Sequence, residues 1–295
     1  MIEFWGLLGN GGSIIGGFAA LKNLTNKPQQ APVGSQLLLS EQSEKNQSEV
    51  LATKILSAKR LHTILSLLNK NRNNKITISE LAEFCGYEKA GDLQRCFDDL
   101  EELTYREQEH ICFCLGINTE WLKHGKGEPF SSQELSIIHA EYYLHTIINK
   151  LPKEIIFVRS RGEDGRAIII LRINEFKYIF SPIIGYFSKS IWSDPVEKRQ
   201  LKYFYILIKA IHNLKTTNCK LDFIFVKGFH IEEKDFDDLT SGEIYPGSIV
   251  NLYNDNWWDD FTDINHSYAY AESYEEKHGK NFIEAQKILK RQLNN

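Results

Sequence analysis

The chain has 295 residues, of which 42% are hydrophobic and 12% aromatic. That length and apolar content can fill one or two folded cores, which excludes a chain that is disordered throughout. The net charge is −4 and the isoelectric point is about 6.2. These values exclude a protein that coats nucleic acid through its overall charge, so any DNA contact must come from a local basic patch.

Residues 4–21, FWGLLGNGGSIIGGFAAL, form an uncharged, glycine-rich apolar run. Its length reaches the roughly 17–25 residues that a membrane-spanning helix needs. Small residues four apart, such as Gly12, Gly16 and Ala20, are typical of helices that pack closely in lipid. The sequence therefore predicts that residues 1–24 are a membrane anchor, or else a tail that self-associates or packs on the rest of the protein.

The residues after this segment bear on its orientation. Lys22 and Lys27 follow it directly, and positive charge on that side would leave the body of an inserted protein in the cytoplasm, on the inner face of the membrane. Residues 25–50 are rich in Gln, Ser, Asn and Pro. This composition predicts a polar linker.

Residues 51–71 predict a long amphipathic helix, because leucine and isoleucine recur there at helical spacing. Residues 54–75 contain six basic residues and no acidic one. Lys59 and Arg60 are candidate DNA contacts in this stretch, although such charges also occur on ordinary solvated helix faces.

Two capping boxes predict the starts of further short helices. In each of them, Thr77 with Glu80 and Thr104 with Glu107, the two side chains can satisfy free N–H groups of a first helical turn. The predicted helices lie in ISELAEFCGY, AGDLQRCFDDLEEL and REQEHICFCLGI. The second of these helices is expected to turn three apolar residues inward: Leu93, Phe97 and Leu100.

Short helices with a tight turn at CGYEKAG are what a helix-turn-helix requires. Together with the ending LGINTEWLKHGKGEPF, they make residues 55–130 resemble the lambda-repressor-like (Cro/CI, or Xre) helix-turn-helix family. The resemblance implies an all-helical domain at residues 51–130 and DNA binding. It also implies that Trp121 and Leu122 anchor the end of the domain.

In this family the second helix of the motif enters the major groove of DNA. The matching positions here run from residue 88 to residue 95, and the resemblance makes Lys89, Gln94 and Arg95 the candidate contacts. Residues 90–102 carry five acidic residues against one basic residue. Because phosphates repel such a helix, a helix-turn-helix that binds a protein partner is an equal alternative.

The C-terminal half predicts a mixed α+β domain at residues 151–295, after a connecting helix at 131–150 that opens with a third capping box, Ser131 and Glu134. Strands are expected in EIIFVRS, AIIILRI, KYIFSPI, LDFIFVKGF and SIVNLYN, and helices at DPVEKRQLKYFYILIKAIHNLK and SYEEKHGKNFIEAQKILKRQ. Four arginines near the RGEDGR hairpin could bind phosphate, but they are interpreted more simply as solvent-facing residues of an edge strand: Arg159, Arg161, Arg166 and Arg172.

The stretch NLYNDNWWDDFTDINHSYAY at residues 251–270 combines aromatic and acidic residues. Trp257, Trp258, Asp259 and Asp260 are the candidate interaction surface, and a plain loop over a core is the alternative. The aspartates fit no known metal-ligand spacing. Residues 221–276 carry fourteen acidic residues against two basic ones, which favours self-association or a basic partner.

The sequence offers no catalytic, metal or cofactor site. The five cysteines form no C-x-x-C pair and are expected to be reduced core thiols, which is typical of a cytoplasmic protein: Cys85, Cys96, Cys112, Cys114 and Cys219. Two non-enzymatic functions stay open. One is a DNA-binding transcriptional regulator of phage-repressor type with a C-terminal sensing or dimerisation domain. The other is a membrane-tethered interaction or effector protein in a phage-defence or toxin-like setting.

Overall fold

The structure is a computed structural model that describes residues 56–132, 140–187, 195–217, 224–253 and 257–294. Residues Glu49–Asn295 form one compact unit. The described residues make a mixed α+β fold, which confirms the predicted class, with a helical segment followed by a four-stranded sheet and its flanking helices. The predicted anchor at residues 4–21 and the linker at 25–50 lie outside the described residues.

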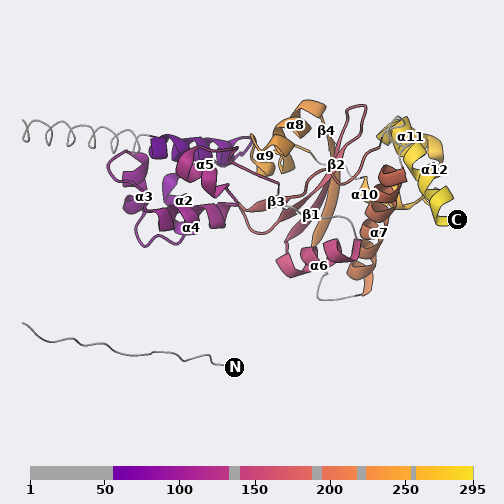
Figure 1. Cartoon of the computed structure of the whole chain (residues 1–295), viewed down its shortest axis with the longest axis horizontal. Helices are drawn as coiled ribbons and strands as arrows, with labels where there is room; N and C mark the ends of the chain where they lie inside the picture. The colour runs from indigo at the N-terminus through magenta and orange to yellow at the C-terminus, as the bar shows by residue number, and fades with distance from the viewer. Residues whose placement is uncertain (1–55, 133–139, 188–194, 218–223, 254–256, 295) are drawn as a thin grey trace, which may run out of the picture. The chain divides into compact units, whose positions relative to one another are not determined.

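The helical segment begins with a helix over residues 56–69. Four short helices follow it (Figure 1): α2 (Ile78–Phe84), α3 (Ala90–Phe97), α4 (Tyr105–Leu115) and α5 (Thr119–His124). The two capping boxes predicted in this segment are confirmed at the starts of α2 and α4. In each box the glutamate carboxylate accepts a 2.7 Å hydrogen bond from the threonine backbone N–H. Local sequence therefore sets where these helices begin.

Glycines in the left-handed conformation end two of these helices. Gly116 (φ 72°) caps α4 and Gly125 (φ 68°) caps α5. A Cβ at Gly116 would lie 3.1 Å from the carbonyl oxygen of Tyr178, so this turn also packs closely against the sheet. Glycine suits this position both for its backbone angle and for its size.

The sheet has the strand order β3-β2-β1-β4. Its strands are β1 (Glu154–Ser160), β2 (Ala167–Arg172), β3 (Tyr178–Phe180) and β4 (Phe225–Ile231). β1 is antiparallel to β2 and parallel to β4. The predicted hairpin joins β1 to β2, and Gly165 (φ 53°) supplies its left-handed residue. β1 is thus an inner strand, paired on both sides.

Two cores cover the two faces of the sheet. The face that includes Phe157 and Ile169 packs against α6 (Ala140–Lys150), α7 (Pro195–Thr217), α10 (Trp258–Thr262), α11 (Ala271–His278) and α12 (Lys280–Asn294). The other face, with Ile156 and Ile170, packs against α8 (Glu233–Ser241), α9 (Pro246–Val250) and residues of the helical segment. Successive side chains of β1 therefore point alternately into two separate cores.

The helical segment joins the sheet through Phe130, which is 2% exposed. Its backbone N–H donates a 3.1 Å hydrogen bond to the carbonyl of Gly242, directly after α8, and its ring lies 5.5 Å from that of Tyr245. Phe84 of α2 packs edge to face against Phe176 from the β2–β3 connection, with the two ring centres 4.5 Å apart. Helical segment and sheet therefore share one hydrophobic core.

The strand predicted at SIVNLYN is wrong, because this stretch contains the end of α9. Pro246 occupies the first turn of α9, a position that favours helix initiation, and Pro246–Val250 are all buried. A short apolar run that is buried on every side has the same hydrophobic pattern in a strand as in a helix. The sequence pattern could not separate the two.

Among the helices that the structure describes, none combines the length and apolarity needed to cross a membrane. Part of the predicted connecting helix at 131–150 is seen as α6, whereas Glu134 of the third capping box lies outside the described residues. The predicted helices at α7, α11 and α12 are confirmed.

Candidate functional site

A helix-turn-helix contacts its partner through the second helix of the motif. Here that helix would be α3, which follows α2 and a turn. α2 is followed by Gly86 (φ 76°), and α3 begins after Lys89, which makes no side-chain capping hydrogen bond. The first N–H groups of α3 therefore have no side-chain cap. Such groups can donate hydrogen bonds to phosphate or carboxylate oxygens of a partner.

The exposed face of α3 contains the three candidate DNA contacts, and two of them are already paired. Lys89, Gln94 and Arg95 are all exposed. The Gln94 amide donates a 3.0 Å hydrogen bond to Asp98, and the Arg95 guanidinium forms an ion pair with Glu101. Lys89 is the remaining candidate, and the residues after it, Ala90 and Gly91, have no hydrogen-bonding side chain.

The end of α3 differs from the prediction at Leu100. The helix ends at Phe97, and Asp99 adopts a left-handed backbone (φ 59°) that reverses the chain. Leu93 and Phe97 are buried as expected, whereas Leu100 is 66% exposed. The expectation for Leu100 assumed a longer helix and is wrong. An apolar side chain consequently stands among exposed acidic residues.

Lys59 and Arg60 lie side by side on the first helix but have different surroundings. The Arg60 guanidinium donates to the carbonyl oxygens of Leu122 (2.9 Å) and Lys123 (3.1 Å) at the end of α5. These carbonyls are among those that a helix leaves unpaired at its C-terminus. Arg60 therefore caps α5, while Lys59 is exposed.

The residues predicted to anchor the end of the helical segment lie in α5. Leu122 is fully buried, and Trp121 is partly buried against the same core. The Asn118 side chain accepts a hydrogen bond from the Glu120 N–H at the start of α5, and Gly125 ends it. The short segment is thus capped at both ends.

The predicted interaction surface at residues 257–260 needs correction. Trp257 is fully buried and Trp258 is 6% exposed, so neither indole is available to a partner in this structure. The Trp257 indole N–H donates a 3.2 Å hydrogen bond to the carbonyl of Phe229 in β4. Asp259 is exposed, and Asp260 is held by His278. The two tryptophans pack against β1 and α7, which the sequence alone could not place beside them.

A buried polar cluster lies at the carboxyl ends of the parallel strands β1 and β4. Arg159 is 5% exposed, and its Nη1 lies 3.2 Å from His230 Nε2 and donates to the carbonyl of His278 at 3.0 Å. Burial lowers the pKa of Arg159 to about 9, so it stays charged at neutral pH. Its guanidinium lies 4.8 Å from the Phe187 ring centre, a cation–π contact.

The interpretation of Arg159 as a solvent-facing residue of an edge strand is therefore wrong, because β1 is paired on both sides. Arg166 forms an ion pair with Asp237 (2.7 Å), and Arg172 forms one with Glu154 (3.1 Å). The one sequence signal for the buried cluster is an arginine directly after the apolar run IIFV in this strand, which alternation alone would place on either face.

Within the described ranges, no group of three or more His, Cys, Asp or Glu residues could hold a metal ion. Cys85, Cys96 and Cys112 are free and buried, and burial raises the pKa of Cys112 to about 11. Buried, protonated thiols are poor metal ligands and poor nucleophiles. Comparison with protein-family models, with curated proteins and with solved structures found no match to this chain.

Proposed function

We propose that residues 56–130 are a helix-turn-helix module of the lambda-repressor type whose α3 face recognises a basic surface of a protein partner. The order and lengths of the helices and the tight turn before α3 support the module. A protein partner is preferred over DNA because of the side-chain pairing on and directly after α3. Gln94 and Arg95 are engaged by Asp98 and Glu101. The polar surface left for a partner is therefore mainly acidic.

Photo-crosslinking in cells tests the partner. A photoreactive amino acid at exposed Leu100 should give a discrete crosslinked protein, and the same residue at Leu252, which is 54% exposed, should not. Charge reversal by Asp98→Lys with Glu102→Lys should abolish the product, since like charges oppose docking to a basic surface. A product that survives the reversal, or that forms equally at Leu252, contradicts the proposal.

DNA binding is the second candidate, and the uncapped start of α3 beside exposed Lys89 favours it. Full-length protein should be titrated into labelled random duplex from about 50 mM salt upwards, where even non-specific binders remain bound. We expect no salt-dependent binding. Binding that weakens steeply with salt and drops in Lys89→Ala would overturn the protein-partner proposal in favour of a regulator of phage-repressor type.

We also propose that residues 4–21 tether the protein to a membrane, on the strength of their uncharged length and their small residues four apart. Cells expressing the full chain or a variant without residues 1–24 should be fractionated in parallel. The full chain is expected in the membrane fraction after a high-salt wash, and the truncated chain in the soluble fraction. Two soluble proteins would refute tethering.

A further inference from the structure

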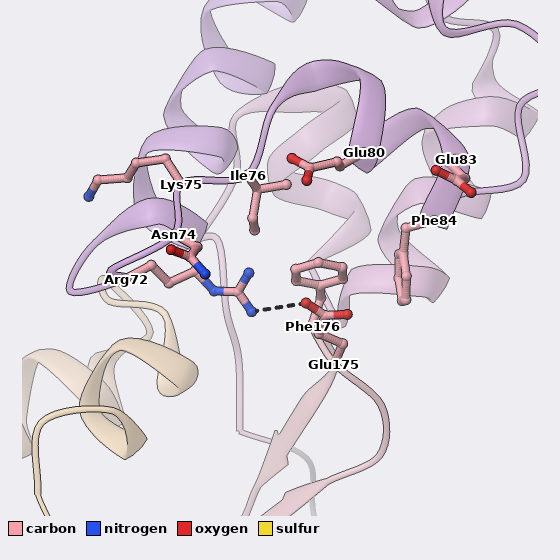
Figure 2. Close-up of a pocket in the computed structure, with 9 residues that line it drawn as sticks. All are labelled: Arg72, Asn74, Lys75, Ile76, Glu80, Glu83, Phe84, Glu175 and Phe176. Carbon is pink, nitrogen blue, oxygen red and sulfur yellow. Dashed lines mark hydrogen bonds and ion pairs between the residues drawn. The ribbon is translucent and has the colours of Figure 1, made fainter.

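A cavity of about 430 Å³ lies between the helical segment and the connection from β2 to β3. Its volume is within the range of small-molecule sites. Figure 2 shows that its walls come from three separate parts of the chain. They are the loop before α2 with Arg72, α2 itself with Glu80 and Phe84, and the β2–β3 connection with Glu175 and Phe176.

The walls of the cavity include an apolar portion. Phe176 is 4% exposed and Ile76 6%, and Phe84 meets Phe176 edge to face at 4.5 Å. In Figure 2, Phe176 lies below Ile76 and Glu80, with Phe84 to one side. A flat apolar group can pack against these side chains.

The charges around the cavity favour a cation. Its lining holds three carboxylates, Glu80, Glu83 and Glu175, against two basic side chains, which gives a net charge of −1. Arg72 is already engaged, since its guanidinium lies 4.9 Å from the Phe176 ring centre and 3.4 Å from Glu175. Lys75 donates a 2.6 Å hydrogen bond to the Asn69 carbonyl and extends away from the other lining residues in Figure 2.

Glu80 is the carboxylate best placed above the aromatic wall. Its Oε2 accepts hydrogen bonds from the N–H (2.7 Å) and hydroxyl (2.9 Å) of Thr77. The backbone hydrogen bond from Thr77 lowers the pKa of Glu80, so the carboxylate is charged at neutral pH. The capping box thus fixes a negative charge at the edge of the cavity.

We propose that this cavity binds a small organic cation, a protonated primary amine attached to a flat apolar group. The apolar group packs against the side chains of Ile76, Phe84 and Phe176, and the ammonium group lies near Glu80. Such a ligand bridges α2 and the β2–β3 connection, and it stabilises the folded state by mass action. The site is independent of what α3 contacts.

The test uses full-length protein and 2-phenylethylamine as the probe, with 2-phenylethanol and 3-phenylpropionate as neutral and anionic analogues of similar shape. Isothermal titration should give a Kd of about 1 mM for the amine, as suits a ligand of this size. Both analogues should bind more weakly. Equal binding of the three compounds, or no amine binding at about 10 mM, overturns the proposal.

Two matched variants locate the site. Glu80→Gln removes the charge but keeps the capping box, which glutamine also supports. Glu107→Gln makes the same change in the box of α4, outside this cavity. We expect Glu80→Gln to weaken amine binding about two- to fivefold, the range of a single exposed charge pair, and Glu107→Gln to leave it unchanged. Equal effects of the two variants overturn the assignment.

Discussion

Single residues show how strongly burial changes the role that a side chain can take. Arg159 lies on an inner strand, where it contacts His230 and the His278 carbonyl instead of solvent. Within the described residues Arg159 forms no ion pair with a carboxylate, and its Nε has no hydrogen-bond partner. A buried charge of this kind is costly unless its surroundings are fixed. Its position argues for a rigid arrangement of β1, β4 and α11.

His278 makes this cluster sensitive to acid. It is 6% exposed, and burial lowers its pKa to about 4 despite the hydrogen bond to Asp260. An unfolded histidine has a pKa of about 6.5, so between those values the unfolded chain binds a proton that the folded chain does not. The free energy of unfolding should therefore fall as the pH falls from about 6.5 to 4, by at most about 3 kcal/mol.

Urea denaturation of the wild type and His278→Gln at pH 7, 6 and 5 measures this contribution. The destabilisation caused by the substitution should shrink as the pH falls, because the variant lacks the titrating group. Taking the difference between the proteins removes the contributions of titrating groups that do not interact with His278, whereas the neighbouring His230 remains part of the difference. A difference that does not vary with pH refutes the assignment.

The starts of α2 and α4 depend on local signals, whereas the end of α5 also depends on a distant residue. The capping threonines of α2 and α4 lie three residues from their glutamates, so the sequence displays both partners together. The end of α5 depends on Arg60, which is 62 residues from Leu122. No short-range pattern could have predicted that cap.

Replacing Arg60 tests this cap at the scale of the element. Arg60→Ala should lower the free energy of unfolding by about 1–3 kcal/mol, because two carbonyls of α5 lose a charged donor. The adjacent Lys59→Ala is the matched control and should change stability by less than about 0.5 kcal/mol, as expected for an exposed position. Equal effects in urea denaturation would show that Arg60 has no capping role.

At the scale of the whole molecule, Phe130 packs against the turn that follows α8. Gly242 (φ 94°) follows α8, and a Cβ there would overlap the carbonyl oxygen of Phe130. Gly86 (φ 76°) follows α2, and a Cβ there would meet nothing within 4 Å. Both glycines have a positive φ, so comparing them separates the cost of that backbone conformation from the cost of close packing.

Gly242→Ala should therefore destabilise the protein by about 3 kcal/mol or more, since it adds a steric overlap to the cost of a positive φ. Gly86→Ala should cost only about 1 kcal/mol. Thermal and urea unfolding of both variants provides the measurement. Similar losses in the two proteins would mean that Phe130 and its surroundings can move away, and that the junction is not tightly packed.

The sequence by itself determined the local features of this protein: the two capping boxes, most helices, the β1–β2 hairpin and the mixed α+β class. The capping boxes and the hairpin turn depend on residues close together in the chain, and the class follows from the order of the elements. It also indicated the helix-turn-helix resemblance, and with it the candidate residues on α3.

Only the tertiary structure decided which side chains are available for function. In the fold, Trp257 and Trp258 are buried, Leu100 is exposed, and Arg60 caps the end of α5. The fold also brings α2 beside the β2–β3 connection around a cavity. The physical reason is that burial and pairing depend on contacts between residues far apart in the chain, such as Arg159 and His278, which no local pattern records.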